Sequence, residues 1–277
     1  MKKIIILSLF LASASFVQAQ WYTIEPPSPC TARTECGLAA HKGAVYLLGG
    51  RGKKPVEKYV FETNTWTPLM ALPVEMHHIT PVSTNGKIYI VGGLTGDFPD
   101  EQPLTHVYVF DPKEKSLKKV FEIPEDRRRG AAGVVQQKGL IYIVGGISNG
   151  HTSGTSAMFD VYDAKKNTWT VLPDAPRVRD HNGAAIVDDL LIAVGGRNTS
   201  YHEEDNFTAY FDTVIDQVDY FNLKTQKWDT YEAKLPAPAA GAGTVGLEGM
   251  VYFIGGETRE GEGVARSRGL KRRKREL

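Results

Sequence analysis

The sequence has little cysteine and almost no net charge. Only two of its 277 residues are cysteine, too few for a disulfide-built scaffold or an all-cysteine zinc site. Lysine and arginine number 33 against 32 aspartate and glutamate, which argues against a dedicated nucleic-acid binder. Hydrophobic residues make up 42%, and this globular proportion excludes a disordered chain. Glycine is plentiful, with 28 residues, and indicates many tight turns.

Residues 1–19 have the pattern of a secretory signal peptide. Two lysines precede an apolar run, residues 4–11, and small residues lead to a cleavage site before Gln20. The apolar run is well short of the roughly 20 residues that span a bilayer, so a membrane anchor is the weaker interpretation. The sequence therefore predicts an exported protein, periplasmic or extracellular, with no membrane insertion after the signal is removed.

The chain ends in a basic segment. Residues 257–277 hold eight lysines and arginines and four glutamates, whereas residues 20–256 carry a net charge of −5. A basic cluster suggests nuclear import or nucleic-acid contact, but an exported chain meets neither import receptors nor a genome. We therefore predict a disordered, solvated tail and no nucleic-acid partner.

A repeat organises residues 20–256. Five segments align without gaps, and each ends in paired glycines: Gly49-Gly50, Gly92-Gly93, Gly145-Gly146, Gly195-Gly196 and Gly255-Gly256. Each segment has two short β-rich runs around a turn such as Asn85-Gly86, whose residues tolerate the positive φ of tight hairpins. The second run is apolar throughout, as in a central strand, and ends in glycine where packing leaves no room for a Cβ.

A third and a fourth strand are expected after the paired glycines. Aromatic pairs mark them at a constant spacing of seven residues: Tyr59 and Trp66, Tyr162 and Trp169, Phe221 and Trp228, with Phe110 and Leu117 as a variant. Such a spacing predicts a column of rings packed between adjacent sheets. Four strands per unit, no helical period and repeats of 43–60 residues predict an all-β fold, a β-propeller of four-stranded blades.

These motifs resemble those of the kelch-repeat family, of exported bacterial type. The double glycine after an apolar strand, a tyrosine within that strand and the spaced tryptophan carry the resemblance over residues 21–256. An arginine also stands 16 residues before the first glycine in three copies, as Arg33, Arg129 and Arg179. The resemblance implies a disc of four-stranded blades around a channel, commonly six or seven blades, with a partner bound by the loops of one face.

The repeat pattern stops within the fifth unit. Residues 21–24 look like an orphan fourth strand that would complete the last blade, but no aromatic pair follows Gly256 to receive it. We expect about five repeats in an incomplete propeller, and we interpret the chain as a truncated or frameshifted form of a longer kelch protein. A closed propeller would be a monomer, whereas an open edge strand favours dimers or poor solubility.

Candidate ligand-binding residues stand at the start of the first strands. The kelch resemblance implies that the residue two after the arginine column faces the channel mouth, and this residue is Glu35, His78, Ala131, His181 or Gly241. His77 and Asp180 stand one step earlier, and the arginines Arg33, Arg129 and Arg179 complete the candidate set. Histidines and carboxylates suit acid–base or metal chemistry. Strand-end histidines also often cap backbone groups, and kelch arginines often form structural bonds between blades; the sequence predicts no metal and no cofactor.

The longest insertion, residues 197–212, adds polar and aromatic candidates. Long structured loops often carry function, although an ordinary solvent loop is the alternative. Tyr201, His202, Tyr210 and Phe211 would suit stacking on a sugar ring, and Arg197 and Asp205 would supply hydrogen bonds.

Cys30 and Cys36 leave two possibilities open. In an exported protein they would form a small-loop disulfide. Alternatively, Cys36 is buried in the first strand beside an unpaired Cys30.

The function that these features favour is a kelch binding scaffold that presents a glycan or a protein ligand with a pocket on its loop face. The alternatives are a carbohydrate-active kelch enzyme, more similar to sialic-acid epimerases than to galactose oxidases, or an inactive fragment of one. The copper site of the oxidases needs a cysteine crosslinked to a tyrosine, and no such constellation is visible. Epimerase chemistry would need two acid–base groups, for which Glu35 with His78 or His181 are candidates.

Overall fold

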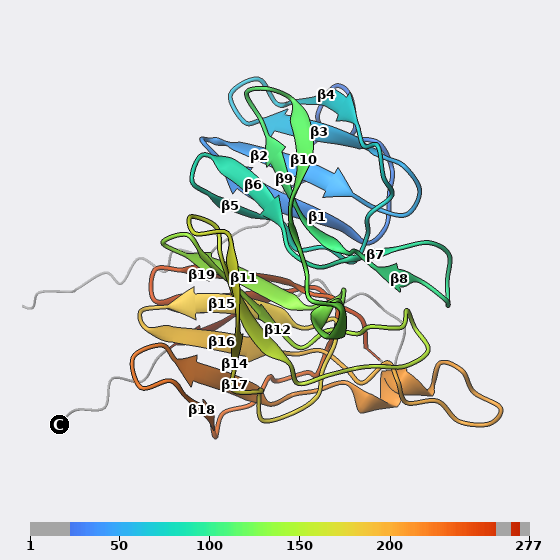
Figure 1. Cartoon of the computed structure of the whole chain (residues 1–277), viewed down its shortest axis with the longest axis vertical. Coiled ribbons are helices and arrows are strands. Elements are labelled where there is room, and N and C mark those ends of the chain that lie inside the picture. The colour runs from blue at the N-terminus through green and yellow to red at the C-terminus, as the bar shows by residue number, and fades with distance from the viewer. Residues whose placement is uncertain (1–22, 259–266, 272–277) are drawn as a thin grey trace, which may run out of the picture.

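The computed structural model describes residues 23–258 and 267–271, which form five larger antiparallel sheets and one two-stranded sheet; we call the five larger sheets blades I to V in chain order. Blade I consists of β1 (Cys36–His41), β2 (Ala44–Gly49), β3 (Pro55–Val60) and β4 (Thr65–Ala71). Blade II consists of β5 (Val82–Thr84), β6 (Lys87–Ile90), β9 (His106–Asp111) and β10 (Ser116–Glu122), and its loop carries the small hairpin of β7 (Leu94–Thr95) and β8 (Gln102–Pro103). Both blades lie in the upper part of Figure 1.

The next two blades repeat the same four-stranded order. Blade III consists of β11 (Gly133–Gln137), β12 (Leu140–Val144), β13 (Phe159–Asp163) and β14 (Thr168–Leu172), and the short helix η1 (Glu125–Arg127) precedes it. Blade IV consists of β15 (Gly183–Val187), β16 (Leu190–Val194), β17 (Val218–Asn222) and β18 (Lys227–Thr230), with η2 (Ala209–Thr213) in its long loop. In the described part of the chain, no helix is long and apolar enough to cross a membrane.

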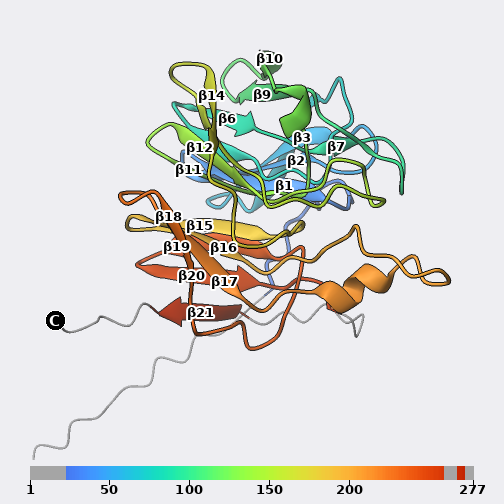
Figure 2. The ribbon, with the colours of Figure 1, turned by 60° about the horizontal axis from the view of Figure 1, so that its bottom comes forward.

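Blade V has three strands in the described residues: β19 (Gly243–Leu247), β20 (Met250–Ile254) and β21 (Ser267–Lys271). The expectation of a disordered tail does not hold for β21, which pairs with β20 and forms the outer strand of the blade in Figure 2. The edge of β20 offers backbone donors and acceptors, and an extended segment pairs with them through its own backbone. The predicted signal peptide and residues 21–22 lie outside the described residues.

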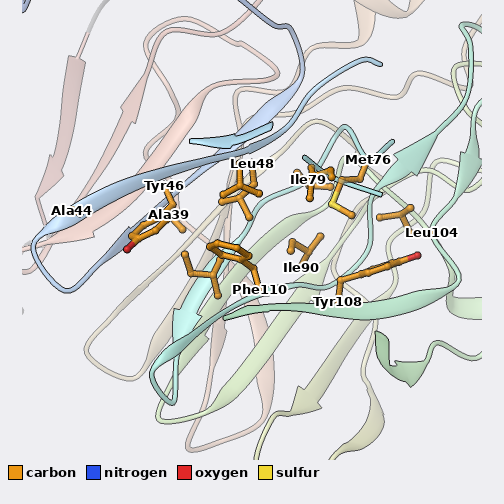
Figure 3. Close-up of a cluster of buried hydrophobic side chains, with 13 residues drawn as sticks. Ala39, Ala44, Tyr46, Leu48, Met76, Ile79, Ile90, Leu104, Tyr108 and Phe110 are labelled. Atoms are coloured by element: carbon orange, nitrogen blue, oxygen red, sulfur yellow. The ribbon is translucent and has the colours of Figure 1, made fainter. Parts of the chain in front are cut away.

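The innermost strands of consecutive blades contact one another, in the order β1, β5, β11, β15 and β19. The hydrophobic clusters lie between blades rather than within them, because each sheet is apolar on both faces. The cluster between blades I and II packs Tyr46 and Leu48 against Met76, Ile90 and Phe110 (Figure 3). The predicted aromatic pairs are directly opposite one another across neighbouring strands, as Tyr59 is to Trp66. The β-propeller prediction is confirmed.

The paired glycines hold neighbouring blades together. Gly145 has φ +68°, and a Cβ there would lie 2.4 Å from the carbonyl oxygen of Arg179 in the next blade. The next glycine, Gly146, donates its N–H to that same carbonyl at 2.8 Å. Glycine is therefore required both by the backbone angle and by the close approach of the next blade.

One side of the ring is uncovered in the described residues. Leu38 on β1 and Val245 and Leu247 on β19 are 60%, 49% and 56% exposed. A Cβ on Gly255, the blade V counterpart of Gly145, would meet nothing within 4 Å. In the other blades, the positions equivalent to these are in contact with a neighbouring blade.

Candidate functional site

One backbone conformation recurs at the start of each blade. Glu35, His78, Ala131, His181 and Gly241 all have φ between +50° and +67°. The amide of each of the last four donates to the carbonyl of its counterpart in the preceding blade, at 2.6–3.0 Å. This chain of hydrogen bonds runs from Gly241 to Glu35 and fixes the five positions side by side at one end of the innermost strands.

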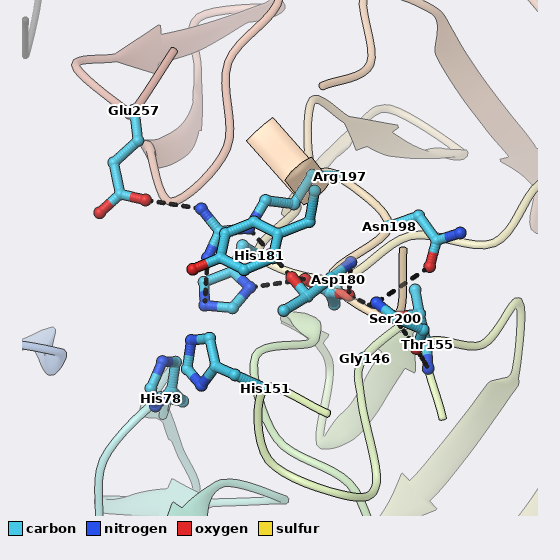
Figure 4. Close-up of polar contacts among 12 residues, drawn as sticks. His78, Gly146, His151, Thr155, Asp180, His181, Arg197, Asn198, Ser200 and Glu257 are labelled. Carbon is cyan, nitrogen blue, oxygen red and sulfur yellow. Dashed lines mark hydrogen bonds and ion pairs between the residues drawn. The ribbon is translucent and has the colours of Figure 1, made fainter. Parts of the chain in front are cut away.

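Four histidines gather at this end, and we call them the histidine cluster: His77, His78, His151 and His181. The ring centroids of His78, His151 and His181 are 5.0, 5.2 and 5.5 Å apart, and Figure 4 shows the three rings turned toward one another. Each comes from a different blade. His151 belongs to the loop after β12 in blade III, whose column residue is only Ala131, and its ring completes a triangle with the other two.

A hydrogen bond at Nδ1 orients each ring. Nδ1 of His151 lies 3.0 Å from the Glu101 carboxylate, and Nδ1 of His181 lies 2.6 Å from that of Asp180. Since carboxylates accept, both histidines carry their proton on Nδ1. His78 Nδ1 lies 2.7 Å from His77 Nδ1.

The tautomer of His78 follows from its neighbour. His77 Nε2 lies 3.1 Å from the Gly96 carbonyl oxygen, which only accepts, so Nε2 of His77 carries the proton. In that tautomer Nδ1 of His77 has no proton and accepts the hydrogen bond from Nδ1 of His78. Nε2 of His78 is then unprotonated, and it is buried without a hydrogen-bond partner. In the described part of the chain, Nε2 of His78 and of His151 has no hydrogen-bond partner, whereas Nε2 of His181 accepts from the Arg197 guanidinium at 3.5 Å.

Burial favours the neutral form of His78 and His151. It holds the pKa of His78 well below its usual value, and the neighbouring His181 and His151 lower it further. Burial likewise lowers the pKa of His151. For Asp180, burial raises the pKa, but bonds from His181, Thr155 and Thr199 outweigh it and the net shift is downward.

Two arginines and four carboxylates surround the cluster. Arg51 bridges Glu35 and Glu101, with a nitrogen 2.5 Å from an oxygen of each. Arg197 pairs with Glu257 at 2.7 Å and lies over the Tyr210 ring at 4.7 Å. Asp180 is the fourth carboxylate, so the carboxylates and guanidinium groups together carry two net negative formal charges.

The three column arginines belong to the scaffold instead. Arg33 is bound to Glu57 and the Gly49 carbonyl, Arg129 to Asp160 and the Gly145 carbonyl, and Arg179 to Asp219 and the Gly195 carbonyl. Their side chains are 2%, 2% and 0% exposed. Their carboxylate and carbonyl partners lie in their own blades, which indicates a structural role rather than the predicted ligand-binding one; only Nε of Arg179 is buried without a hydrogen-bond partner in the described residues.

The long loop keeps only part of its predicted role. His202 is stacked on Phe207, and its two ring nitrogens contact the carbonyls of Phe207 and Thr152, so it has no free nitrogen. Tyr210 is buried, whereas Tyr201 is 41% exposed with its hydroxyl on Glu203. Asp205 and Phe211 complete the predicted set; Asp205 is exposed and Phe211 half-buried beneath the Arg197 guanidinium.

Two exposed rings lie beside the histidine cluster. Phe98 and Phe207 are 52% and 39% exposed and meet edge to face, although they come from blades II and IV. Phe98 also contacts His151, with centroids 5.0 Å apart. We call Phe98 and Phe207 the aromatic rim.

Sequence reasoning missed His151, Glu101, Arg51 and the aromatic rim. The sequence does hint at His151. Ala131 is too small to reach the site from the position where the neighbouring repeats have His78 and His181, so a side chain from another segment has to fill that space. A second signal was available for Arg51, because Arg51 and Arg197 hold the same position after the paired glycines. Nothing local marks Glu101.

The cysteines form no disulfide. Both Cys30 and Cys36 are free thiols, so the disulfide alternative is corrected. Between them, Thr31 and Arg33 are bound to Glu57, which fixes the intervening segment on blade I. Burial raises the pKa of the Cys36 thiol.

Comparisons with known proteins agree with the fold. The model of the KLHDC2/KLHL20/DRC7 Kelch-repeats domain matches residues 76–265. Kelch-like protein terF of Aspergillus terreus is 30% identical, over 81% of this chain and 50% of its own length. Kelch-like protein 40 of Xenopus tropicalis is 26% identical, over 80% of this chain and 35% of its own length. The chain therefore spans half or less of these relatives. The solved structure of YjhT is 21% identical and covers 87% of this chain and 82% of its own, with a TM-score of 0.74.

Proposed function

Because the chain belongs to the kelch-repeat family, we propose that it is an exported binding scaffold that holds a glycan at the end of the propeller where the aromatic rim meets the histidine cluster. Family members are scaffolds for binding partners, and the choice of a glycan rests on the chemistry of this end. Export rests on the signal-peptide pattern of residues 1–19.

One observation carries the proposal: exposed rings stand directly beside a set of charged and polar groups. Sugar rings present apolar C–H faces and hydroxyl edges, which aromatic faces and bidentate charged groups recognise together. Phe98 and Phe207 are exposed for stacking, and Glu35 and Arg51 are partly exposed, with side chains 29% and 26% accessible. An ordinary solvent loop would not bring rings from two blades into contact.

A glycan array tests this proposal on the exported chain with its signal removed. We expect Phe98→Ala and Phe207→Ala each to weaken binding by about tenfold or more, since stacking of one ring contributes roughly 0.5–1.5 kcal/mol beyond its area burial. Phe61→Ala is the matched control, because Phe61 is 56% exposed on the distant turn between β3 and β4.

Equal binding by all three variants would remove the aromatic rim from the site. If no glycan is retained and a protein is bound instead, the scaffold role stands and the ligand class is wrong. Export has its own readout: the mass of the secreted protein should correspond to a chain that begins at Gln20.

A further inference from the structure

We propose that His78, His151 and His181 bind one divalent first-row transition-metal ion, of which Zn²⁺ is the probe, through their three Nε2 atoms. The proposal departs from the sequence-based expectation of no metal. It goes beyond glycan binding and does not depend on it.

The spacing of the rings fits a shared ion. A Zn–N bond of ~2.0–2.1 Å places an imidazole centroid about 3.2 Å from the metal, so at tetrahedral angles three centroids lie about 5.2 Å from one another. The observed separations are 5.0, 5.2 and 5.5 Å. The candidate ligand nitrogens also lie within 4.8 Å of one another.

The tautomers of the three histidines leave ring lone pairs available to a metal ion. Because each Nδ1 carries its proton toward an acceptor, each Nε2 has a lone pair, and among the described residues only that of His181 has a donor, the Arg197 guanidinium at 3.5 Å. Nε2 of His78 is a buried acceptor without a partner, on a side chain that is 3% exposed. A metal ion would bind the lone pairs of His78 and His151 directly and would replace the long contact of Arg197 with His181.

The groups behind the rings are those of a metal centre. Metal-bound histidines usually donate their other N–H to a carboxylate or a further acceptor, which fixes the tautomer and raises the basicity of the ligand. Glu101 and Asp180 do this for His151 and His181, and His77, itself anchored on the Gly96 carbonyl, does it for His78.

The local charge also favours a cation. The guanidinium of Arg197 approaches His181 Nε2 at 3.5 Å, the long limit of a hydrogen bond, but Glu257 neutralises it. Four carboxylates against two guanidinium groups leave a net negative environment. Neutral imidazole ligands suit zinc, copper, iron and nickel rather than Ca²⁺ or Mg²⁺, and three protein ligands leave a fourth position for a water or a ligand atom.

Zinc binding to the chelator-treated full chain tests the proposal, without any sugar present. Competition against a chromophoric chelator should give one Zn²⁺ per chain, and Co²⁺ should give the intense visible absorption of tetrahedral coordination. His78→Ala, His151→Ala and His181→Ala should each weaken binding about 100-fold or more, and Asp180→Asn and Glu101→Gln about 10–100-fold. Alanine is compatible with the backbone at 78 and 181, because Ala131 has the same φ of about +50°.

His106→Ala is the matched control, since His106 lies on β9 with its ring Nδ1 2.8 Å from the Thr105 hydroxyl, and its loss should leave binding unchanged. His78→Gln supplies a second variant if the alanine variant does not fold. Zinc uptake equal in the wild type and in the double variant His78→Ala/His181→Ala would overturn the proposal, as would no uptake at all. Glycan binding by the metal-free protein is measured separately, so failure of one proposal leaves the other testable.

Discussion

The buried ion pair of blade I allows a quantitative test of how the scaffold is held together. Arg33 and Glu57 are 2% and 5% exposed, and Glu57 has no other cationic partner among the described residues; Thr31 supplies its remaining hydrogen bonds. Arg33 also donates to the carbonyls of Gly49 and Pro55, at 2.9 and 2.8 Å. Replacing Arg33 with Met leaves a buried carboxylate without a counter-charge.

We expect Arg33→Met to lower the free energy of unfolding by about 3–5 kcal/mol, the usual cost of breaking a buried pair by removing one partner. The double variant Arg33→Met/Glu57→Gln removes the stranded charge and loses mainly the bonds to the carbonyls, at about 1–3 kcal/mol in total. The second substitution should therefore restore about 2 kcal/mol.

Blade II supports this expectation, because it already has a neutral version of the same arrangement. In blade II, Met76 takes the place of the column arginine, and Tyr108 takes the place of the glutamate. Tyr108 is paired with Ile90 just as Glu57 is paired with Leu47 in blade I. Urea unfolding followed by tryptophan fluorescence provides the measurement. If the double variant unfolds at the same or a lower urea concentration than Arg33→Met, the destabilisation does not come from the unpaired carboxylate and the reasoning is wrong.

Two further predictions concern the glycines and the thiols. Gly145→Ala should destabilise the protein by about 2–5 kcal/mol, because of positive-φ strain and a clash with the Arg179 carbonyl. Gly86→Ala is the control: Gly86 has φ +77° and nothing within 4 Å, so its replacement should cost only the backbone strain of about 1–2 kcal/mol. Equal losses of stability in thermal unfolding would contradict a role of Gly145 in blade contact. Alkylation of the native, unreduced protein should give two adducts by mass spectrometry. Cys36 should react more slowly than Cys30, because burial raises the pKa of the Cys36 thiol. A protein that is modified only after reduction would instead contain a disulfide.

Much of the fold could be predicted from sequence because its determinants are local and recur. The turn at Asn85-Gly86 has positive φ at both residues, and the spacing from Tyr59 to Trp66 is the length of one hairpin, so these features specify strands without knowledge of distant contacts. The strand β21 could not be predicted, because its sequence has no repeat motif and its pairing is a contact with the distant strand β20.

The sequence by itself determined the blades and the gathering of His78, Asp180 and His181, since equivalent positions of a repeat lie at equivalent places in a ring. Only the tertiary structure decided which groups complete the cluster. His151 and Glu101 come from loops that obey no repeat, and they meet because two loops of different blades cross the same end of the ring. The arginine column shows the converse: the repeat marked it, but burial against Asp160 and Asp219 makes it structural, because a buried guanidinium must find its counter-charge within the blade.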